Sequence, residues 1–450
     1  MKHIIRLILV VSLLLIALLT FTASAAPADF TYTMKGNGTA IITGYKSNDV
    51  NVYIPKMLDG YTVSTIADNA FEGNKTMMTV NIPDTVTSIG DKAFFECEKL
   101  NGVTIPASVQ SIGIGAFAGC DKGLSFAVDK ANPVYTTIDQ ILYNKKTKTL
   151  VCCPRGKELL ENTIPNGIIE IGEYSFYQHT NELEIDYIPN SIDIIKSHAF
   201  EDCEMVFYEQ KLSVDTIESY AFSKCQIEIT PISEHAYIQA NYIREYAFYD
   251  CQLLLPNIFQ TECELEVCCP VIENSAFENV KTEGSRIWIS IRLPQTVKIG
   301  SNAFKGSRAY EFYFSDTLVE IGDSAFENAY IIQNAVGEHF IISDYTELPD
   351  SLVRIGERAF AASNFATNTV NLINEITLPL GLEFIGEEAF YSSFERTIII
   401  PESVTEIGDN ICDRKYGTLE VVSGSYAATY AAENGYKYMY SGEDDLSWLN

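Results

Sequence analysis

The sequence is poor in positive charge, and this shortage narrows what the protein can bind. Its 450 residues include 31 Lys and Arg against 60 Asp and Glu, which gives a formal net charge of −29. An acidic surface repels phosphate backbones and anionic lipids, so we expect binding neither to nucleic acid nor to a membrane surface. Solubility is the simplest explanation for the acidic excess.

Motifs for catalysis and metal binding are also missing. The chain has no G-x-S-x-G, H-E-x-x-H, Walker or Rossmann motif, and none of its five His stands at a zinc-like spacing from a Cys group. The abundant acidic residues leave a glycosidase-like carboxylate pair open, although such a pair would need a deep pocket. We therefore predict no enzyme activity, no cofactor and no metal site; a secreted hydrolase with its site in an irregular segment is the enzymatic alternative.

Long apolar runs are absent except at the start of the chain. A basic stretch ending at Arg6 precedes an apolar run from Leu7 to about Phe21, and Ala23-Ser24-Ala25 follows directly. This order predicts a secretory signal peptide over residues 1–25; the alternative is an uncleaved anchor, because residues 4–21 approach the length of a spanning helix. Cleavage would remove Lys2 and Arg6 and take the net charge from −29 to −31. We expect a secreted or surface-associated extracellular protein with no membrane insertion after cleavage.

Most of the remaining chain repeats one phrase, Ile-Gly-x-x-Ala-Phe. Twelve copies end at an anchor Phe, namely Phe71, Phe94, Phe117, Phe176, Phe200, Phe222, Phe248, Phe277, Phe304, Phe326, Phe360 and Phe390, and a degenerate thirteenth ends at Cys412. The anchors are 23, 23, 59, 24, 22, 26, 29, 27, 22, 34 and 30 residues apart. The basic unit is thus 22 to 23 residues long, and the excess length marks insertions.

Each repeated position has a physical explanation. The residue before the anchor is Ala in every copy except Ser175, which indicates close contact between successive coils, while the Phe fills the interior. Alternating apolar residues such as Val103-x-Ile105 predict short strands, and the Pro that follows ends the strand at a corner. Stacked units bury faces that one unit cannot bury alone, so we expect parallel strands that form continuous sheets.

The repeat resembles the BspA-like, treponemal-type leucine-rich repeat, as the segment from Leu100 to Cys120 (LNGVTIPASVQSIGIGAFAGC) shows most clearly. The resemblance covers roughly residues 30 to 440. It implies a mainly β leucine-rich-repeat solenoid and a role in adhesion or surface recognition. The copies at Phe222, Phe248 and Phe277 have lost the Ile-Gly step, so we expect irregular coils there.

We divide the chain into a signal peptide (1–25), N-terminal cap strands (26–63), repeats (64–412, with an insertion at 121–163), a C-terminal cap (413–440) and an acidic tail (441–450). The insertion is expected to hold a hairpin of residues 138–143 and 149–153 around a basic tip. In the C-terminal cap, Ser425 is expected to cap a helix over residues 426–434.

Eleven Cys in a secreted chain suggest disulfides, but five of them occupy one repeat position, three residues after an anchor: Cys97, Cys120, Cys203, Cys225 and Cys251. Mostly small residues occupy this position in the other copies, as expected for the Asn/Cys turn position of leucine-rich repeats. We favour buried free thiols. Bridges between adjacent coils remain an alternative, because they depend on a Cα separation that sequence does not give. A loop disulfide among Cys152, Cys153, Cys263, Cys268 and Cys269 is a further alternative.

Two sets of residues are candidates for contact with a partner. Strand residues between buried neighbours must face outward, which predicts one exposed row of Asn81, Thr104, Arg292, Tyr313, Thr377 and Ile399. The other set is the basic tip, Lys145, Lys146 and Lys148; it is either a solvated turn or a self-association contact with an acidic face.

These observations favour a non-catalytic solenoid that recognises an extracellular or cell-surface protein. The alternative is a self-assembling structural component of the cell envelope, suggested by the basic tip on an acidic body.

Overall fold

The computed structural model describes residues 27–207, 211–229, 235–254, 263–282, 289–309, 311–331, 348–363, 375–392 and 397–441. The predicted signal peptide and all but the first residue of the predicted tail lie outside these residues. Contacts divide the chain into two compact units, Met1–Lys146 and Thr147–Asn450, each of which is described separately. Within the described ranges, no helix combines the length and the apolar character needed to cross a membrane.

The N-terminal unit begins with a 3-10 helix, Pro27–Asp29, and builds two sheets from its successive coils. The first sheet has the order β1 (Phe30–Met34), β2 (Thr39–Tyr45), β5 (Tyr61–Ile66), β7 (Ser88–Ile89) and β9 (Ser111–Ile112), with β4 (Met57–Leu58) also paired to β5. The second has the order β10 (Ser125–Val128), β8 (Gly102–Ile105), β6 (Thr79–Asn81) and β3 (Asn51–Tyr53). Pairs of β1–β2 and β4–β5 are antiparallel, and the pairs between coils are parallel.

A hairpin of β11 (Tyr135–Ile138) and β12 (Ile141–Asn144) ends this unit. The sequence predicted one strand over residues 138–143, but a turn at Asp139 and Gln140 divides that segment. Both residues have positive φ, 48° and 68°, and therefore cannot continue a strand.

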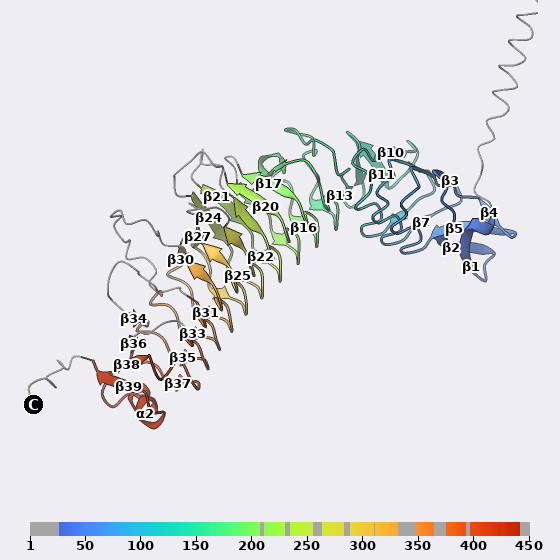
Figure 1. Cartoon of the computed structure of the whole chain (residues 1–450). Coiled ribbons are helices and arrows are strands. Elements are labelled where there is room, and N and C mark those ends of the chain that lie inside the picture. The colour runs from blue at the N-terminus through green and yellow to red at the C-terminus, as the bar shows by residue number, and fades with distance from the viewer. Residues whose placement is uncertain are drawn as a thin grey trace, which may run out of the picture. The chain divides into compact units, whose positions relative to one another are not determined.

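In the C-terminal unit, one long parallel sheet runs from coil to coil; we call it the main sheet. Its order is β13 (Thr149–Cys152), β14 (Glu170–Ile171), β16 (Ile194–Ile195), β19 (Thr216–Ile217), β22 (Tyr242–Ile243), β25 (Val271–Ile272), β28 (Lys298–Ile299), β31 (Glu320–Ile321), β33 (Arg354–Ile355), β35 (Phe384–Ile385) and β37 (Glu406–Ile407). Figure 1 shows these short strands following one another along one side of the unit.

The other side of the same coils carries shorter parallel sheets. One has β15 (Leu183–Glu184), β17 (Glu204–Phe207), β20 (Gln226–Ile229), β23 (Gln252–Leu254) and β26 (Lys281–Thr282), after which β29 (Arg308–Ala309) pairs with β32 (Tyr330–Ile331). The next, which we call the outer sheet, has β18 (Lys211–Ser213), β21 (His235–Gln239), β24 (Cys263–Cys268), β27 (Ile289–Leu293) and β30 (Phe312–Phe314). A last sheet has β34 (Glu375–Thr377), β36 (Thr397–Ile400), β38 (Thr418–Val421) and β39 (Lys437–Tyr440). A second 3-10 helix spans Ile185–Tyr187.

The anchor Phe side chains form a stacked column in the core of each unit. In the C-terminal unit, consecutive anchors from Phe176 to Phe390 stack with ring centroids 4.8–5.5 Å apart. The residue before each anchor, Ala in every copy except Ser175, is buried, and in most coils its carbonyl accepts a hydrogen bond from the anchor N–H of the preceding coil, as from Phe200 to Ala221 at 2.8 Å. A side chain larger than Ala would separate the coils at this point, which confirms the predicted role of both positions.

Among the described residues, the copies at Phe222, Phe248 and Phe277 keep the main-sheet strand and the anchor stack, so the expected irregularity does not occur on this side of the coils. Their main-sheet strands pair in register, and their anchors continue the aromatic column at 4.8–5.1 Å. The Ile of the main-sheet strand and the Ala-Phe pair are buried in these coils as in the others.

The C-terminal cap follows the predicted pattern. Helix α2 spans Tyr426–Glu433, and the Ser425 side chain accepts a hydrogen bond from the Ala428 N–H, as expected of an N-cap. The Tyr430 hydroxyl donates to the Gly408 carbonyl at 2.8 Å. This bond ties the helix to the last coil of the main sheet.

Candidate functional site

The six residues of the predicted row do face outward, but they lie on three sheets instead of one. Asn81 and Thr104 are cross-strand neighbours on β6 and β8 of the N-terminal unit. Arg292 pairs with Tyr313 on the outer sheet, and Thr377 pairs with Ile399 on β34 and β36. The row that sequence alternation predicts is thus divided into three pairs, one on each sheet.

The pair on the outer sheet belongs to a longer line of polar side chains. In the strand register, Lys211, Tyr237, Glu266, Arg292 and Tyr313 occupy directly opposed positions on five successive strands. We call these five residues the outer row. Lys211 is the first residue of β18, and each of the other four lies between two neighbours whose side chains are buried or nearly so, such as Leu265 and Val267 beside Glu266. Their exposure follows from the alternation of a strand whose other face is in the core.

Contacts hold the C-terminal half of the outer row in place. The Arg292 guanidinium lies 4.1 Å from the centroid of the Tyr313 ring, and its Nε lies 2.7 Å from a carboxylate oxygen of Glu264. The Tyr313 hydroxyl donates to the Glu311 carboxylate. Burial, followed by this hydrogen bond, raises the pKa of the Tyr313 phenol, so the hydroxyl stays protonated and remains a donor.

The middle of the outer row is fixed by a thiol. The Cys268 Sγ donates to Oε1 of Glu266 at 3.2 Å. Burial, with this carboxylate beside it, raises the pKa of Cys268 to about 11, which keeps the thiol neutral. The outer row therefore offers a rigid set of Tyr, Arg and Glu side chains with 40% of the Arg292 side chain exposed.

The residues of the basic tip fall in two different units. In the N-terminal unit, Lys145 Nζ donates to the Asn132 carbonyl at 2.6 Å, while Lys146 is exposed. In the C-terminal unit, Lys148 is exposed and has a φ of 56°. Lys145 thus helps to fold its own hairpin, and Lys146 and Lys148 keep the exposure that a contact would need.

A second surface, which the sequence interpretation missed, lies at the turn after the main-sheet strands. Where most other coils have Gly after the strand Ile, four consecutive coils have Lys196, Glu218, Arg244 and Glu273; we call these four residues the charged ladder. Lys196 Nζ lies 2.8 Å from Glu218 and 4.0 Å from Glu170, and Arg244 lies 2.5 Å from Glu273. The charges thus alternate in sign along the coils.

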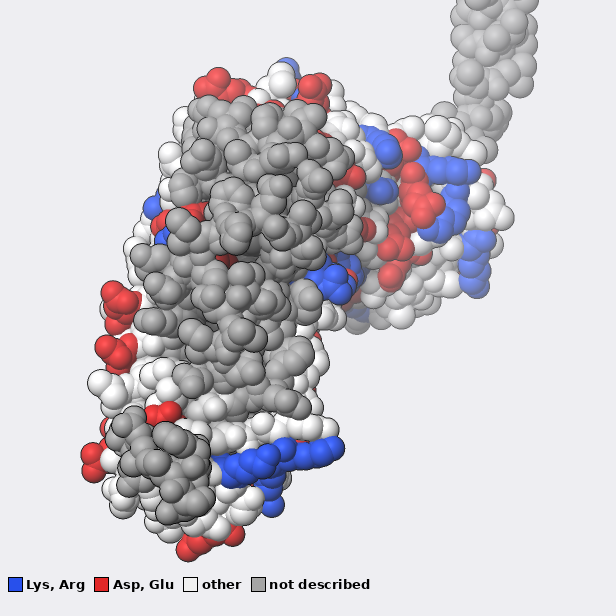
Figure 2. All heavy atoms as spheres, turned by 60° about the vertical axis from the view of Figure 1, so that its left-hand side comes forward, with Lys and Arg blue, Asp and Glu red and all other residues white. Residues whose placement is uncertain are grey.

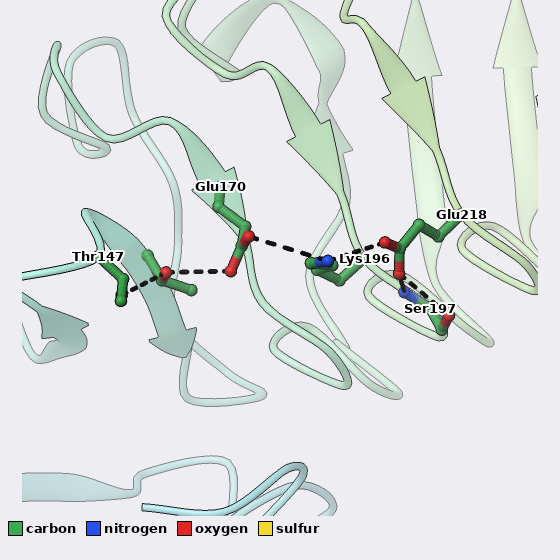
Figure 3. A network of polar contacts seen from close by, with 6 residues as sticks. Thr147, Glu170, Lys196, Ser197 and Glu218 are labelled. Atoms are coloured by element: carbon green, nitrogen blue, oxygen red, sulfur yellow. Dashed lines mark hydrogen bonds and ion pairs between the residues drawn. The ribbon is translucent and has the colours of Figure 1, made fainter. Parts of the chain in front are cut away.

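Figure 3 shows the N-terminal part of this arrangement. The Thr149 hydroxyl donates to Glu170 at 3.0 Å, and Glu218 accepts hydrogen bonds from the Ser197 N–H and hydroxyl at 3.2 and 3.3 Å. Each charged side chain contacts the coil before or after it, so the network runs along the solenoid.

Two residues further on, the same turns carry a line of aromatic rings. Tyr174, His198, Tyr220 and Tyr246, which we call the aromatic ladder, stack with centroids 4.6, 5.1 and 4.9 Å apart and planes within 4° of parallel. All four are half-buried. Because the ring faces cover one another, the accessible part of each ring is its rim.

The backbone at the aromatic ladder is left-handed, with φ between 57° and 61°. This conformation suits Gly or Asn and costs other residues roughly 1–2 kcal/mol each. The same position is left-handed in the other coils too, where it holds residues such as Asn69, Gly115 and Asn302. Four bulky aromatic residues in succession are therefore not explained by local backbone preference.

A shallow groove of about 300 Å³ crosses three coils beside this surface and bears on the enzymatic alternative. Its lining includes His179, Cys203, Asp202 and Lys224. Burial lowers the pKa of His179 and raises the pKa of the Cys203 thiol well above 9. A nucleophilic cysteine needs the opposite shift, so this His and Cys do not form an activated pair.

All eleven cysteines are buried thiols that form no disulfide in the structure. Among the residues that the structure describes, no group of three or more His, Cys, Asp and Glu is placed to hold a metal ion. On the face shown in Figure 2, acidic and basic side chains of the described residues are interspersed and do not form one broad basic surface.

Comparisons with known proteins agree with this architecture. The model of the BspA type leucine rich repeat region matches six copies, over residues 64–154, 152–283 and 342–415. No curated protein matches the chain.

Several solved structures are similar to the chain over most of its length. A leucine rich cell surface protein from Faecalibacterium prausnitzii is 20% identical, with 94% of this chain and 95% of that chain covered and a TM-score of 0.37. A leucine-rich repeat protein from Bacteroides ovatus is also 20% identical, with coverages of 92% and 98% and a TM-score of 0.39. The pneumococcal vaccine antigen PcpA is 13% identical, with coverages of 88% and 80% and a TM-score of 0.29.

The family match extends over more than half of the chain, and the repeated strands, the Ala-Phe core and the small-residue turn position account for it. The chain belongs to the BspA type leucine-rich repeat family.

Proposed function

We propose that this chain is a secreted or cell-surface, non-catalytic protein that binds an extracellular or cell-surface protein through its outer row. The observation that carries the proposal is the outward cluster of Arg292, Tyr313 and Glu266 on the outer sheet. Arg and Tyr are enriched in protein–protein interfaces and among their energetic hot spots. The predicted signal peptide supports a location outside the cytoplasm.

The contacts within the outer row favour binding because they order it in advance. Arg292 is held by Glu264 and the Tyr313 ring, and Tyr313 by Glu311. Side chains that are ordered before binding lose less conformational entropy when a partner docks. Adjacent strands are roughly 4.7–4.9 Å apart, so the row offers a partner a regular line of contacts along the solenoid.

The test is a pull-down of extracellular-matrix and cell-surface proteins with the mature chain, followed by affinity measurement on the captured protein. Arg292→Ala and Tyr313→Ala should each weaken binding by about tenfold, the loss expected for a hot-spot side chain. Arg354→Ala is the matched control. The Arg354 guanidinium lies 3.7 Å from the centroid of the Phe384 ring on the main sheet, so this substitution removes the same kind of contact at a place outside the outer row. Equal binding by wild type and both outer-row variants would refute the proposal.

A further inference from the structure

The aromatic ladder and the charged ladder occur together, in coils that depart from the repeat in the same places. Lys196, Glu218 and Arg244 each stand two residues before His198, Tyr220 and Tyr246, respectively. A Cβ at Gly113 or Gly386, at the position of the charged ladder, would lie 2.4 and 2.3 Å from the backbone nitrogen of the preceding coil. These coils therefore have charged residues in place of the crowded Gly and bulky rings at a left-handed position, and such departures concentrate at functional surfaces.

The backbone of these coils is nevertheless conventional. The backbone N–H of each charged-ladder residue donates to the carbonyl oxygen of the strand Ile in the preceding coil, at 2.9–3.2 Å. The Gly residues at this position in other coils donate in the same way. The substitutions thus change the surface of the turn and leave its fold intact.

The order of charges along the ladder is self-complementary. Lys196, Glu218, Arg244 and Glu273 run positive, negative, positive, negative at the repeat distance of the strands. Consider a second copy that lies antiparallel to the first, related by a two-fold axis between β19 and β22. Lys196 of each copy then lies opposite Glu273 of the other, and Glu218 of each copy lies opposite Arg244 of the other. Such an arrangement is the isologous contact of a two-fold dimer.

The surroundings of the ladder also favour a second copy. The ladder has two charges of each sign, and the neighbouring Glu201 is paired with Lys224 at 2.8 Å and with His198 at 2.7 Å. The ladder itself is thus balanced in charge, in a chain of net charge −29 whose acidic surfaces otherwise repel one another. The rims of Tyr220 and Tyr246, with the exposed Tyr242 beside Arg244, provide the Tyr-rich and Arg-containing composition of an interface.

We propose that two copies of this chain associate through the charged and aromatic ladders, antiparallel about a two-fold axis between β19 and β22. The partner is a second copy of the same chain, and the contact consists of two Lys196–Glu273 and two Glu218–Arg244 pairs flanked by the tyrosine rims. This surface is distinct from the outer row, so association of copies and recognition of another protein are separate properties.

The test uses two charge reversals of the mature chain and sedimentation velocity over a range of concentrations. Glu218→Arg places an arginine opposite Arg244 at both symmetry-related contacts, and Arg244→Glu places a glutamate opposite Glu218 in the same way. Each variant alone should dissociate, with its dissociation constant raised about 100-fold or more, because like-charge contacts replace attractive ones. An equimolar mixture should form a heterodimer, since the arginine introduced in the first variant then faces the glutamate introduced in the second.

Glu320→Arg is the control. It makes the same change in charge and breaks the 2.9 Å ion pair with Lys298 on the main sheet, outside the ladder. This control should sediment as wild type, and circular dichroism should show that all variants are folded. A wild-type chain that is monomeric at every concentration, or a mixture of the two reversals that stays monomeric, overturns the proposal. Equal dissociation of the Glu320→Arg control overturns it too.

Discussion

At the scale of single residues, the cysteines of the repeat act as hydrogen-bond donors in the core. The Sγ atoms of Cys203, Cys225 and Cys251 lie 3.0, 2.9 and 2.9 Å from the carbonyl oxygen of the anchor Phe in the preceding coil. Ser307 donates in the same way to the Phe277 carbonyl at 2.6 Å. A small side chain with a donor thus adds a hydrogen bond to a buried carbonyl next to the aromatic column.

Replacing one of these thiols tests that role. Cys251→Ala removes the side-chain donor from the Phe222 carbonyl, which keeps the Cys225 N–H at 3.2 Å, and should lower the free energy of unfolding by about 0.5–1.5 kcal/mol. Cys251→Ser keeps a donor of similar size and should lose less than half as much. Urea unfolding of both variants measures the difference. Equal losses from Ala and Ser would show that the thiol serves only to fill space.

Sequence reasoning found these positions because they repeat. The Phe and Ala positions recur with one residue type or two, and the five Cys recur at one position; these residues are buried in the structure, as repetition predicted. The left-handed residues were not predictable in the same way. At these positions stand Lys92, Tyr220, Arg358 and Glu388, whose side chains have no preference for positive φ, because the stacking of coils imposes the conformation.

At the scale of strands and turns, the Gly of the Ile-Gly step sets how closely two coils approach. A Cβ added at Gly113 would lie 2.4 Å from the Asp91 backbone nitrogen, well inside contact distance. The Asp91 side chain accepts a hydrogen bond from the Ile114 N–H at 2.8 Å at the same point. The turn is therefore crowded by backbone atoms that cannot move without separating the strands.

Gly113→Ala should accordingly lower the free energy of unfolding by about 1–3 kcal/mol, the loss typical of overpacking. Gly36→Ala is the control in the same unit, because no atom lies within 4 Å of a Cβ at Gly36. Thermal unfolding should show a lower midpoint for the first variant and an unchanged midpoint for the second. A Gly113→Ala variant as stable as wild type would mean that Lys196 and Glu218 require no special adjustment of their coils.

The same scale explains why the predicted row was divided. Alternation along a strand gives the direction of each side chain, so the outward orientation of Arg292 and Thr377 could be predicted. Which strands lie side by side depends on the lengths of the connecting segments, and these vary between coils. The sequence shows the charged ladder as four copies in which Lys196, Glu218, Arg244 and Glu273 replace the usual Gly. The repeat pattern alone did not indicate that these side chains form a connected surface.

At the scale of the whole molecule, the chain has two compact units, and their boundary falls between Lys146 and Thr147. This boundary lies within the longest interval between two anchors, the 59 residues from Phe117 to Phe176, where the sequence predicted an insertion. The sequence did not predict a boundary there, because excess length in a repeat protein indicates an insertion and says nothing about which coils share a core. In each unit, the stacked anchor rings pack each coil against the next and so stabilise neighbouring coils together.

This organisation predicts that a core substitution acts within its own unit. Phe304→Ala removes a fully buried ring that stacks on Phe277 and Phe326 at 5.2 and 5.3 Å, and should destabilise by about 3–5 kcal/mol. Because coils contact mainly their neighbours, backbone hydrogen exchange should become faster in residues 263–331 and stay unchanged in residues 39–128. Phe94→Ala, which interrupts the stack from Phe71 to Phe117, should produce the reverse pattern. Faster exchange in both units after either substitution would show that the two aromatic columns unfold as one cooperative structure.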